Sequence, residues 1–126
     1  MSENITPAEP ERIEIQHVLI SFAGTGTKAR RSKDEAAALA AETLARANAG
    51  EDFDTLVRDL TDDSAPGIYR LANLGVAPAG RNEYPRNRMV AAFGDVGFGL
   101  GVGDIGVADF DPRTSPYGWH IIKRLS

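Results

Sequence analysis

The chain has 126 residues and a formal net charge of −4, with 42% apolar and 25% charged residues, which predicts one domain with a buried core. It has no cysteine, so disulfides and thiolate metal sites are excluded, and its acidic balance argues against a nucleic-acid partner. No apolar run approaches the roughly 18 residues of a membrane helix, and the N-terminus lacks a signal-peptide pattern, so we expect a cytoplasmic protein without a membrane partner. No large apolar surface signal indicates an oligomer, so a monomer is the default expectation.

The N-terminal part is predicted to hold a leader, a buried strand and a basic loop. Residues 1–11 carry two prolines and several acids, so we predict a flexible leader before a single domain over residues 12–126. Residues 12–22 alternate and then become continuously apolar, as in a strand that is buried on both faces. The basic group of the following loop comprises Lys28, Arg30, Arg31 and Lys33.

Two helices are predicted next. Ser32 and Glu35 have the spacing of a capping box, which predicts a helix that begins there and runs to Asn48. Its core face is predicted to comprise Ala37, Ala40, Ala41 and Leu44. A second helix is predicted to begin near Asp52, because the apolar residues that follow are spaced at i, i+3, i+4 and i+7; they are Phe53, Leu56, Val57 and Leu60.

The second half of the chain is predicted to contain mainly strands and loops. The predicted order is a turn at 61–67, a weak strand at 69–75, a long loop at 76–87, a short helix at 88–93, and strands at 105–110 and 119–125. The glycine-rich residues 94–103 argue against a regular element there. Helices grouped between strands predict an α+β domain with one sheet covered by helices.

The two histidines of the chain lie near its opposite ends. His17 and His120 each stand in a short β-branched and apolar run that is typical of a strand. They converge only if the first and last strands pair near the middle of one sheet. Two imidazoles side by side on a sheet would form a candidate site. Trp119 is predicted to face the opposite side, toward the core, because strand side chains alternate.

Seven short segments, taken in order, resemble the parvulin-type peptidyl-prolyl cis/trans isomerases. They are Gln16-His-Val-Leu-Ile20, Gly50-Glu-Asp-Phe53, Thr61-Asp-Asp-Ser64, Leu74-Gly75, Met89-Val-Ala-Ala-Phe93, Gly97-Phe-Gly-Leu-Gly-Val-Gly-Asp-Ile105 and Gly118-Trp-His-Ile-Ile122. The likeness covers residues 14–125 and implies a four-stranded, mostly antiparallel sheet surrounded by helices, in the order β-α-α-(α)-β-α-β-β. The chain departs from the pattern between Gly75 and Met89, where it is longer, and at 94–99, where glycines replace helix formers.

The resemblance implies catalysis of rotation about X–Pro bonds in peptides or unfolded protein clients. This rotation has a barrier of about 18–20 kcal/mol and makes no covalent bond, so it requires neither a cofactor nor a metal. The catalyst must hold the proline ring, exclude water and favour the twisted amide over both planar isomers. The resemblance places His17 and His120 beneath the site, bonded to each other, and Asp63 beside the isomerising carbonyl.

The resemblance also implies the residues that hold the substrate. Met89 and Phe93, one turn apart on a short helix, would form an apolar cup for the proline ring with Leu74 beside them. Tyr117 would flank this cup. The family position that usually holds Thr or Ser falls on either Ser115 or Pro116, and we assign it to Ser115.

Other interpretations compete with this one. The same groove could hold extended or proline-containing segments as a chaperone-like binding module, with negligible catalysis. Both histidines and Asp63 could instead serve a metal-dependent hydrolase, although two imidazoles bonded to each other leave little room for a metal. The basic loop could read a phosphorylated residue before the proline, or form only a solvated surface. Residues 24–28 fail the spacing of a phosphate-binding loop.

Overall fold

The computed structural model describes residues 9–80 and 82–126. Most of the predicted leader, residues 1–8, lies outside this description. The elements are β1 (Arg12–Ile20), α1 (Lys33–Asn48), α2 (Phe53–Leu60), β2 (Ile68–Ala72), β3 (Glu83–Pro85), the 3₁₀ helix η1 (Arg86–Arg88), α3 (Ala91–Gly99), β4 (Ile105–Ala108) and β5 (Trp119–Arg124). None of the helices in the described ranges is long and apolar enough to cross a bilayer.

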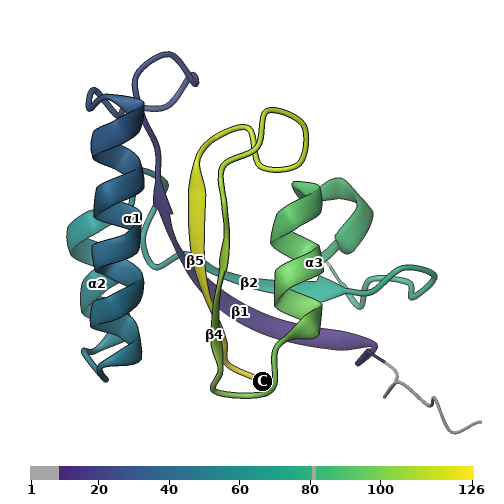
Figure 1. The fold of residues 1–126 in the computed structure, drawn as a ribbon. Helices are drawn as coiled ribbons and strands as arrows, with labels where there is room; N and C mark the ends of the chain where they lie inside the picture. Colours follow the sequence, from purple (N-terminus) through teal and green to yellow (C-terminus); the bar gives the residue numbers. More distant parts are fainter. Residues whose placement is uncertain (1–8, 81) are drawn as a thin grey trace, which may run out of the picture.

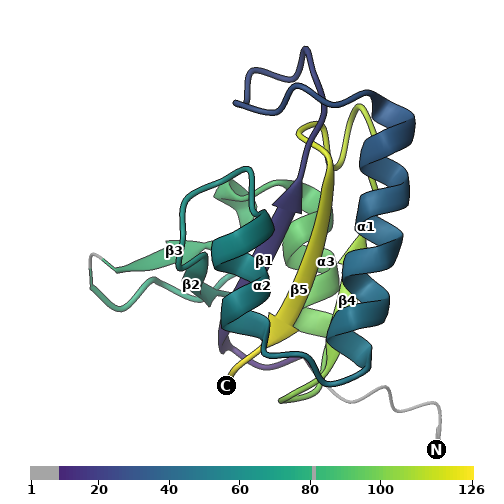
Figure 2. The same cartoon turned by 90° about the vertical axis from the view of Figure 1, so that its left-hand side faces the viewer.

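The strands form one sheet in the order β3-β2-β1-β5-β4, so the first and last strands of the chain are neighbours at its centre. Helices α1 and α2 cover one face of this sheet and α3 covers the other (Figures 1 and 2). The predicted α+β class and the pairing of the first and last strands are therefore confirmed. The family resemblance allowed an optional third helix between α2 and β2. The described residues there, 61–67, form turns and bends and contain no helix.

The sheet has five strands in the described residues, whereas four were expected. The additional strand, β3, lies inside the predicted loop 76–87 and pairs parallel with β2, with Leu71 opposite Tyr84. Glu83 holds it in place, because its buried carboxylate accepts hydrogen bonds from Arg12 and from the Ala79 N–H. These partners are distant in sequence or lie in a loop, so no local pattern indicated the strand.

Helix α1 begins at the predicted capping box, in which Ser32 accepts from the Glu35 N–H and the Glu35 carboxylate accepts from the Ser32 N–H. Its predicted core face is right for Ala40, which is buried, and for Leu44, which packs partly buried against the core, but wrong for the exposed Ala37 and Ala41. The buried residues are Ala36, Ala40, Thr43 and Ala47, a stripe rotated by about one residue from the predicted one. Thr43 can be buried because its hydroxyl donates to the Leu39 carbonyl one turn earlier.

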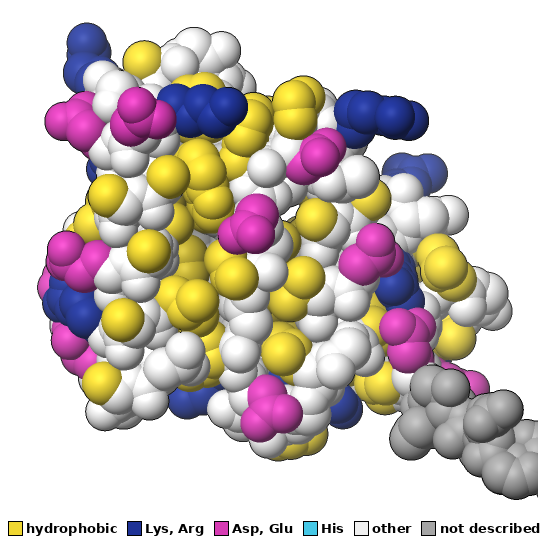
Figure 3. Space-filling view, in the orientation of Figure 1, with side chains coloured by type: hydrophobic (Ala, Val, Ile, Leu, Met, Phe, Trp, Pro, Cys, Tyr) yellow, Lys and Arg dark blue, Asp and Glu magenta, His cyan; other side chains and the backbone are white. Residues whose placement is uncertain are grey.

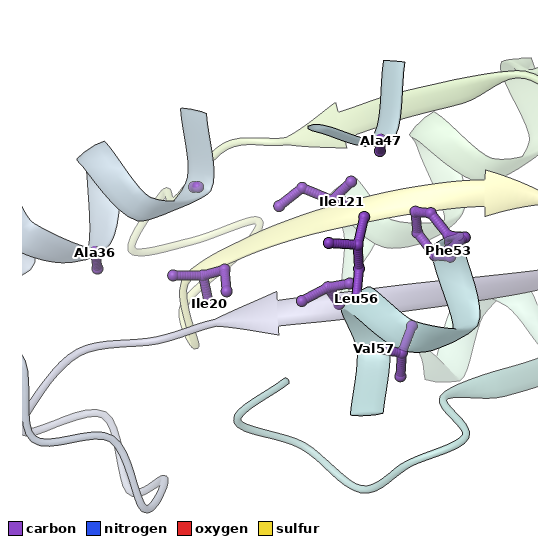
Figure 4. Packing of buried hydrophobic residues seen from close by; sticks show 9 residues of the cluster. Ile20, Ala36, Ala47, Phe53, Leu56, Val57 and Ile121 are labelled. Carbon is purple, nitrogen blue, oxygen red and sulfur yellow. The ribbon is translucent and has the colours of Figure 1, made fainter. Parts of the chain in front are cut away.

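Helix α2 follows its predicted pattern. Asp52 caps it by accepting from the Thr55 N–H, and Phe53, Leu56 and Val57 are buried. These three side chains pack with Ile20 and Ile121 of the central strands, and the alanines of α1 complete this layer (Figure 4). On the molecular face shown in Figure 3, apolar side chains gather between α1 and β4, and no histidine side chain is visible.

Helix α3 runs through most of the glycine-rich segment, so the prediction of an irregular chain there is wrong. The expected helix at 88–93 is shifted, with a 3₁₀ turn at Arg86–Arg88 and the α-helix beginning at Ala91. The glycines allow close packing: a Cβ at Gly94 would lie 2.8 Å from Cγ of Arg86, and one at Gly97 would lie 3.3 Å from Cδ1 of Ile13. Packing space explains glycine here better than backbone freedom does.

Candidate active site

The two histidines meet on the face of the sheet that α3 covers. In the antiparallel pairing of β1 with β5, Leu19 lies opposite His120 and His17 lies opposite Ile122. His17 and Leu19 are two residues apart on one strand and share a face, so both imidazoles project to the same side. Their Nδ1 atoms are 3.0 Å apart, their rings are stacked at 5.2 Å, and both side chains are buried.

Two glycines let neighbouring segments approach β1 closely. The N–H of His17 donates to the carbonyl of Gly67 at 3.0 Å. Gly67 has φ +66°, and a Cβ there would lie 2.6 Å from the His17 carbonyl oxygen. Gly118 has φ +141°, and a Cβ there would lie 2.2 Å from the Ile20 carbonyl oxygen. Any other residue at these two positions would push the supporting backbone away from the histidine strand.

Asp63 completes a hydrogen-bonded row of side chains with His17 and Tyr69. Its Oδ2 lies 3.2 Å from Nε2 of His17 and accepts from the Tyr69 hydroxyl at 3.1 Å. The hydrogen bond from His17 lowers the pKa of the Asp63 carboxyl to about 2. Burial, with the nearby charge of Asp63, raises the pKa of Tyr69 to about 12. At neutral pH the row therefore contains an ionised carboxylate and a neutral phenol.

This row assigns the tautomers of both imidazoles. Because Asp63 is ionised, Nε2 of His17 donates to it, and a neutral His17 then offers only a lone pair at Nδ1. Nδ1 of His120 must donate to that lone pair, which leaves Nε2 of His120 without a proton. That nitrogen is buried and has no hydrogen-bond partner among the described residues. Burial, and then the neighbouring His17, lowers the pKa of His120 to about 3, so His120 is neutral.

Phe93 covers the imidazole pair from the α3 side. Its ring centroid lies 5.0 Å from that of His17 and 5.3 Å from that of His120, with steep interplanar angles of 82° and 70°. The ring of Tyr69 stands at 5.9 Å from Phe93 in the same edge-on manner. The polar row is thus enclosed by aromatic carbon, which keeps water from its buried end.

A cavity of about 390 Å³ opens over these residues. It is lined by His17, Leu19, Gly26, Thr27, Asp62, Asp63, Tyr69, Met89, Val90, Phe93, Tyr117 and His120. Its volume lies in the range of small-ligand sites, and its lining combines apolar walls with a few convergent polar groups. The volume and lining of the cavity suit a small, mainly apolar group.

The structure brings six of the eight sequence-predicted site residues to this cavity. They are His17, Asp63, His120, Met89, Phe93 and Tyr117. The prediction that Met89 lies on the helix is wrong, because it stands just after η1 in extended backbone, two residues before α3. It reaches the cavity next to Val90 and Phe93 nonetheless.

Leu74 and Ser115, which were predicted to hold the substrate, do not line the cavity. Leu74 is 62% exposed in the turn after β2 and lines a separate hollow with Pro85 and Arg86. Ser115 is fully buried and its hydroxyl donates to the Gly118 carbonyl at 2.7 Å. That bond closes the turn before β5, which is a supporting position beneath the site.

Tyr69 is the main site residue that the sequence did not indicate. It lies opposite Ile15 in the pairing of β1 with β2 and therefore shares the face that carries His17. The sequence shows that Tyr69 and Leu71, two residues apart, share one face of a strand. It does not show the register between β1 and β2. Thr27 and Val90 join the lining from a loop and from a helix cap, where no periodic signal exists.

The four cations of the basic loop do not line the cavity. Nη1 of Arg31 donates to Oδ2 of Asp62 at 2.5 Å and to the Ser21 carbonyl at 2.9 Å. The ammonium of Lys33 lies over the ring of Phe110, 4.7 Å from its centroid. Lys28 and Arg30 are exposed. Within residues 9–80 and 82–126, no group of three or more His, Asp or Glu side chains is arranged to hold a metal ion.

Comparison with known proteins agrees with this arrangement. Residues 3–125 match the family model described as the PPIC-type PPIASE domain. The chain therefore belongs to the parvulin-type family of peptidyl-prolyl isomerase domains. It is 37% identical over 124 residues to the protein "Chaperone SurA" of Albidiferax ferrireducens, covering 98% of this chain and 24% of that protein. The chain thus spans about a quarter of the length of this curated relative.

Solved structures share the fold at lower identity. The TbPIN1 solution structure has a TM-score of 0.68 at 21% identity, covering 92% of this chain and 98% of that one. Peptidyl-prolyl isomerase ESS1 from Candida albicans has a TM-score of 0.67 at 20% identity, covering 92% and 63%. PrsA from Bacillus subtilis has a TM-score of 0.58 at 23% identity, covering 92% and 35%.

Proposed function

We propose that this chain is a peptidyl-prolyl cis/trans isomerase that acts on X–Pro bonds in peptides and in unfolded or flexible protein segments. One observation carries the proposal: an apolar cup opens directly above a pair of buried, hydrogen-bonded imidazoles beside an ionised carboxylate. Membership of the family supports the reaction class. The arrangement offers what a non-covalent isomerisation needs and contains no activated nucleophile.

The cup acts on the amide through its environment. Met89, Val90 and Phe93 would hold the proline ring and displace water from the X–Pro bond. A planar amide draws stabilisation from charge separation between its oxygen and nitrogen, and this separation is lost at the 90° twist. A dry environment therefore favours the twisted amide relative to the planar one. Each 1.4 kcal/mol of this preference accelerates rotation about tenfold.

Asp63 adds an electrostatic contribution in the same direction. Its carboxylate is oriented by His17 and Tyr69 and remains ionised at neutral pH. Beside the isomerising carbonyl, this fixed negative charge would disfavour the planar form, in which the carbonyl oxygen is most negative. The twisted form, with less charge on that oxygen, would be repelled less. His17 acts here as a positioning residue for the carboxylate.

Exchange spectroscopy by NMR on a proline tetrapeptide tests the proposal. The expected result is an accelerated cis/trans exchange between the two sets of proline resonances at a catalytic protein concentration. The Leu74→Ala variant should retain this acceleration, because Leu74 lies outside the cavity. If no proline peptide shows accelerated exchange, the isomerase proposal is wrong.

A second candidate function is a chaperone-like module that binds proline-containing segments without catalysis. The observation that favours it is the 37% identity to a protein named as a chaperone, of which the chain spans 24%. The same exchange experiment separates the two functions. Chemical-shift changes on peptide titration without faster isomer exchange would support binding alone.

A further inference from the structure

The charges around the cavity are unbalanced. Asp62 and Asp63 are the acidic side chains in its described lining, and no lysine or arginine lines it. An empty site with this lining presents negative charge to whatever enters. The distribution of that charge depends on how each carboxylate is partnered within the protein.

Asp62 is already neutralised by the fold. Its Oδ2 accepts hydrogen bonds from Nη1 of Arg31 at 2.5 Å and from the N–H of Ser21 at 2.8 Å. The side chain of Asp62 is only 8% exposed. The Asp62 N–H also donates to the carbonyl of Leu19 at 2.8 Å. Asp62 therefore connects its turn to the end of β1, and its charge is cancelled locally by Arg31.

Asp63 differs from Asp62 in its exposure and in its partners. Its side chain is 38% exposed and its hydrogen-bond partners are the imidazole of His17 and the hydroxyl of Tyr69. Among the described residues, no lysine or arginine forms an ion pair with Asp63. The carboxylate is thus ionised, held in one orientation, open to the cavity and without a lysine or arginine partner.

We infer that Asp63 selects client segments by charge, favouring a lysine or arginine next to the proline and disfavouring a glutamate, aspartate or phosphorylated residue there. This inference rests on the proposed function, because it assumes that the proline ring occupies the cup. The ring of Phe93 and the carboxylate of Asp63 both adjoin His17, so a neighbour of the bound proline comes within reach of the carboxylate. We assign the selected position to the residue that precedes the proline, whose carbonyl isomerises.

The basic loop does not reverse this selection. Arg31 is committed to Asp62, and Lys33 lies over Phe110. Lys28 and Arg30 project from the loop as exposed side chains outside the cavity lining. A phosphorylated residue before the proline would therefore meet a carboxylate that no lysine or arginine neutralises, and no lysine or arginine lines the cavity to receive it.

The test uses tetrapeptides Ala-Xaa-Pro-Phe in which Xaa is lysine, norleucine, glutamine, glutamate or phosphoserine. Dissociation constants are measured by NMR titration of the wild-type protein at about 20 mM and about 300 mM salt, which change the screening length several-fold. Lysine should bind about two- to fivefold more tightly than norleucine at low salt, and glutamate should bind more weakly than glutamine by a similar factor. Both differences should shrink at high salt.

Two variants separate the role of Asp63 from that of the loop. Asp63→Asn should bring the ratio of lysine to norleucine affinity close to one, whatever it does to the affinity for every peptide. Arg30→Gln, a matched exposed cation outside the cavity, should leave that ratio unchanged. The wild-type salt dependence requires no substitution, so the inference stays testable even if Asp63→Asn does not fold.

The outcomes are distinct. Equal affinities for lysine and norleucine at low salt, or tightest binding of phosphoserine, would overturn the inference and leave the isomerase proposal standing. The absence of binding and of accelerated exchange for all five peptides would overturn both proposals.

Discussion

The Nδ1 atoms of His17 and His120 lie 3.0 Å apart, although the two residues are separated by 103 positions in the chain. The bond joins the two central strands of the sheet on the face that carries the cavity. Each imidazole depends on the other, because both are buried and Asp63 determines the direction of the whole row. Stability and site geometry are therefore coupled at this pair.

The losses of unfolding free energy on replacing His17 and His120 should not be additive. His17→Leu leaves the Nδ1–H of His120 buried without an acceptor, and His120→Leu removes the donor to Nδ1 of His17. Each single variant should lose about 1–3 kcal/mol of unfolding free energy, and the double variant should lose clearly less than the sum. Urea denaturation of the four proteins measures this cycle. Additive losses would show that the imidazoles do not depend on each other.

Because of His120, acidification should begin to destabilise the protein at a pH well above the pH range in which most carboxylates titrate. The pKa of His120 is lowered from its ordinary value of 6.5 to about 3, so between these values the unfolded chain binds a proton that the folded chain does not. Folding stability should then fall by up to about 1.4 kcal/mol per pH unit as the pH drops below 6.5. Urea denaturation at intervals from pH 7 to pH 5 measures the slope. His120→Asn should flatten it, and an unchanged slope would contradict the assignment.

Asp63 should lower the folding stability on acidification in the same direction as His120, but at lower pH. Its folded pKa, lowered to about 2 from an ordinary value of 3.8, means that its stabilising contribution is complete above pH 4. That contribution should disappear as the pH falls from about 4 through about 2. In an NMR titration, the carboxyl carbon of Asp63 should have its midpoint at lower pH than the carboxyl carbons of exposed aspartates. A titration midpoint near 4 would contradict the hydrogen bond from His17.

Two glycines of α3 should respond to alanine in opposite directions. At Gly99 a Cβ would meet no atom within 4 Å, so Gly99→Ala should stabilise the protein by about 0.5 kcal/mol through helix propensity. At Gly94 a Cβ would lie 2.8 Å from Cγ of Arg86, whose guanidinium is held by Asn73 and Asp95. Gly94→Ala should therefore destabilise by about 1–3 kcal/mol. Thermal and urea unfolding compare the pair, and equal effects would contradict the packing explanation.

Met89 and Leu74 form a matched pair for the cavity. Met89 lines it and is partly buried, whereas Leu74 is exposed beside a separate hollow. Met89→Ala should weaken the binding of a proline peptide about fivefold, which corresponds to about 1 kcal/mol of lost apolar contact, with the fold intact. Leu74→Ala should leave the dissociation constant unchanged. Equal behaviour of the two variants in NMR titration would rule out the cup.

The sequence predicted the elements whose determinants are local. The capping box at Ser32 and the apolar stripe of α2 act among residues a few positions apart, so the beginnings of both helices were read correctly. The alternation around His17 and His120 identified two strands, and the family resemblance implied that they meet. These signals need no knowledge of what lies across the sheet.

Tertiary structure decided the features that depend on approach between distant segments. Glycines at 94–99 indicated an irregular chain by propensity, yet α3 forms there because it can pack closely only where side chains are missing. Strand register places Tyr69 in the site, where it was not predicted, and the turn after β2 places Leu74 outside it. Neighbouring residues along the chain do not encode either feature. Local periodicity and capping arise from bonds within one element and can be read along the chain. Partners, burial and net charge inside a cavity arise from packing between elements, and they exist only once the chain has folded.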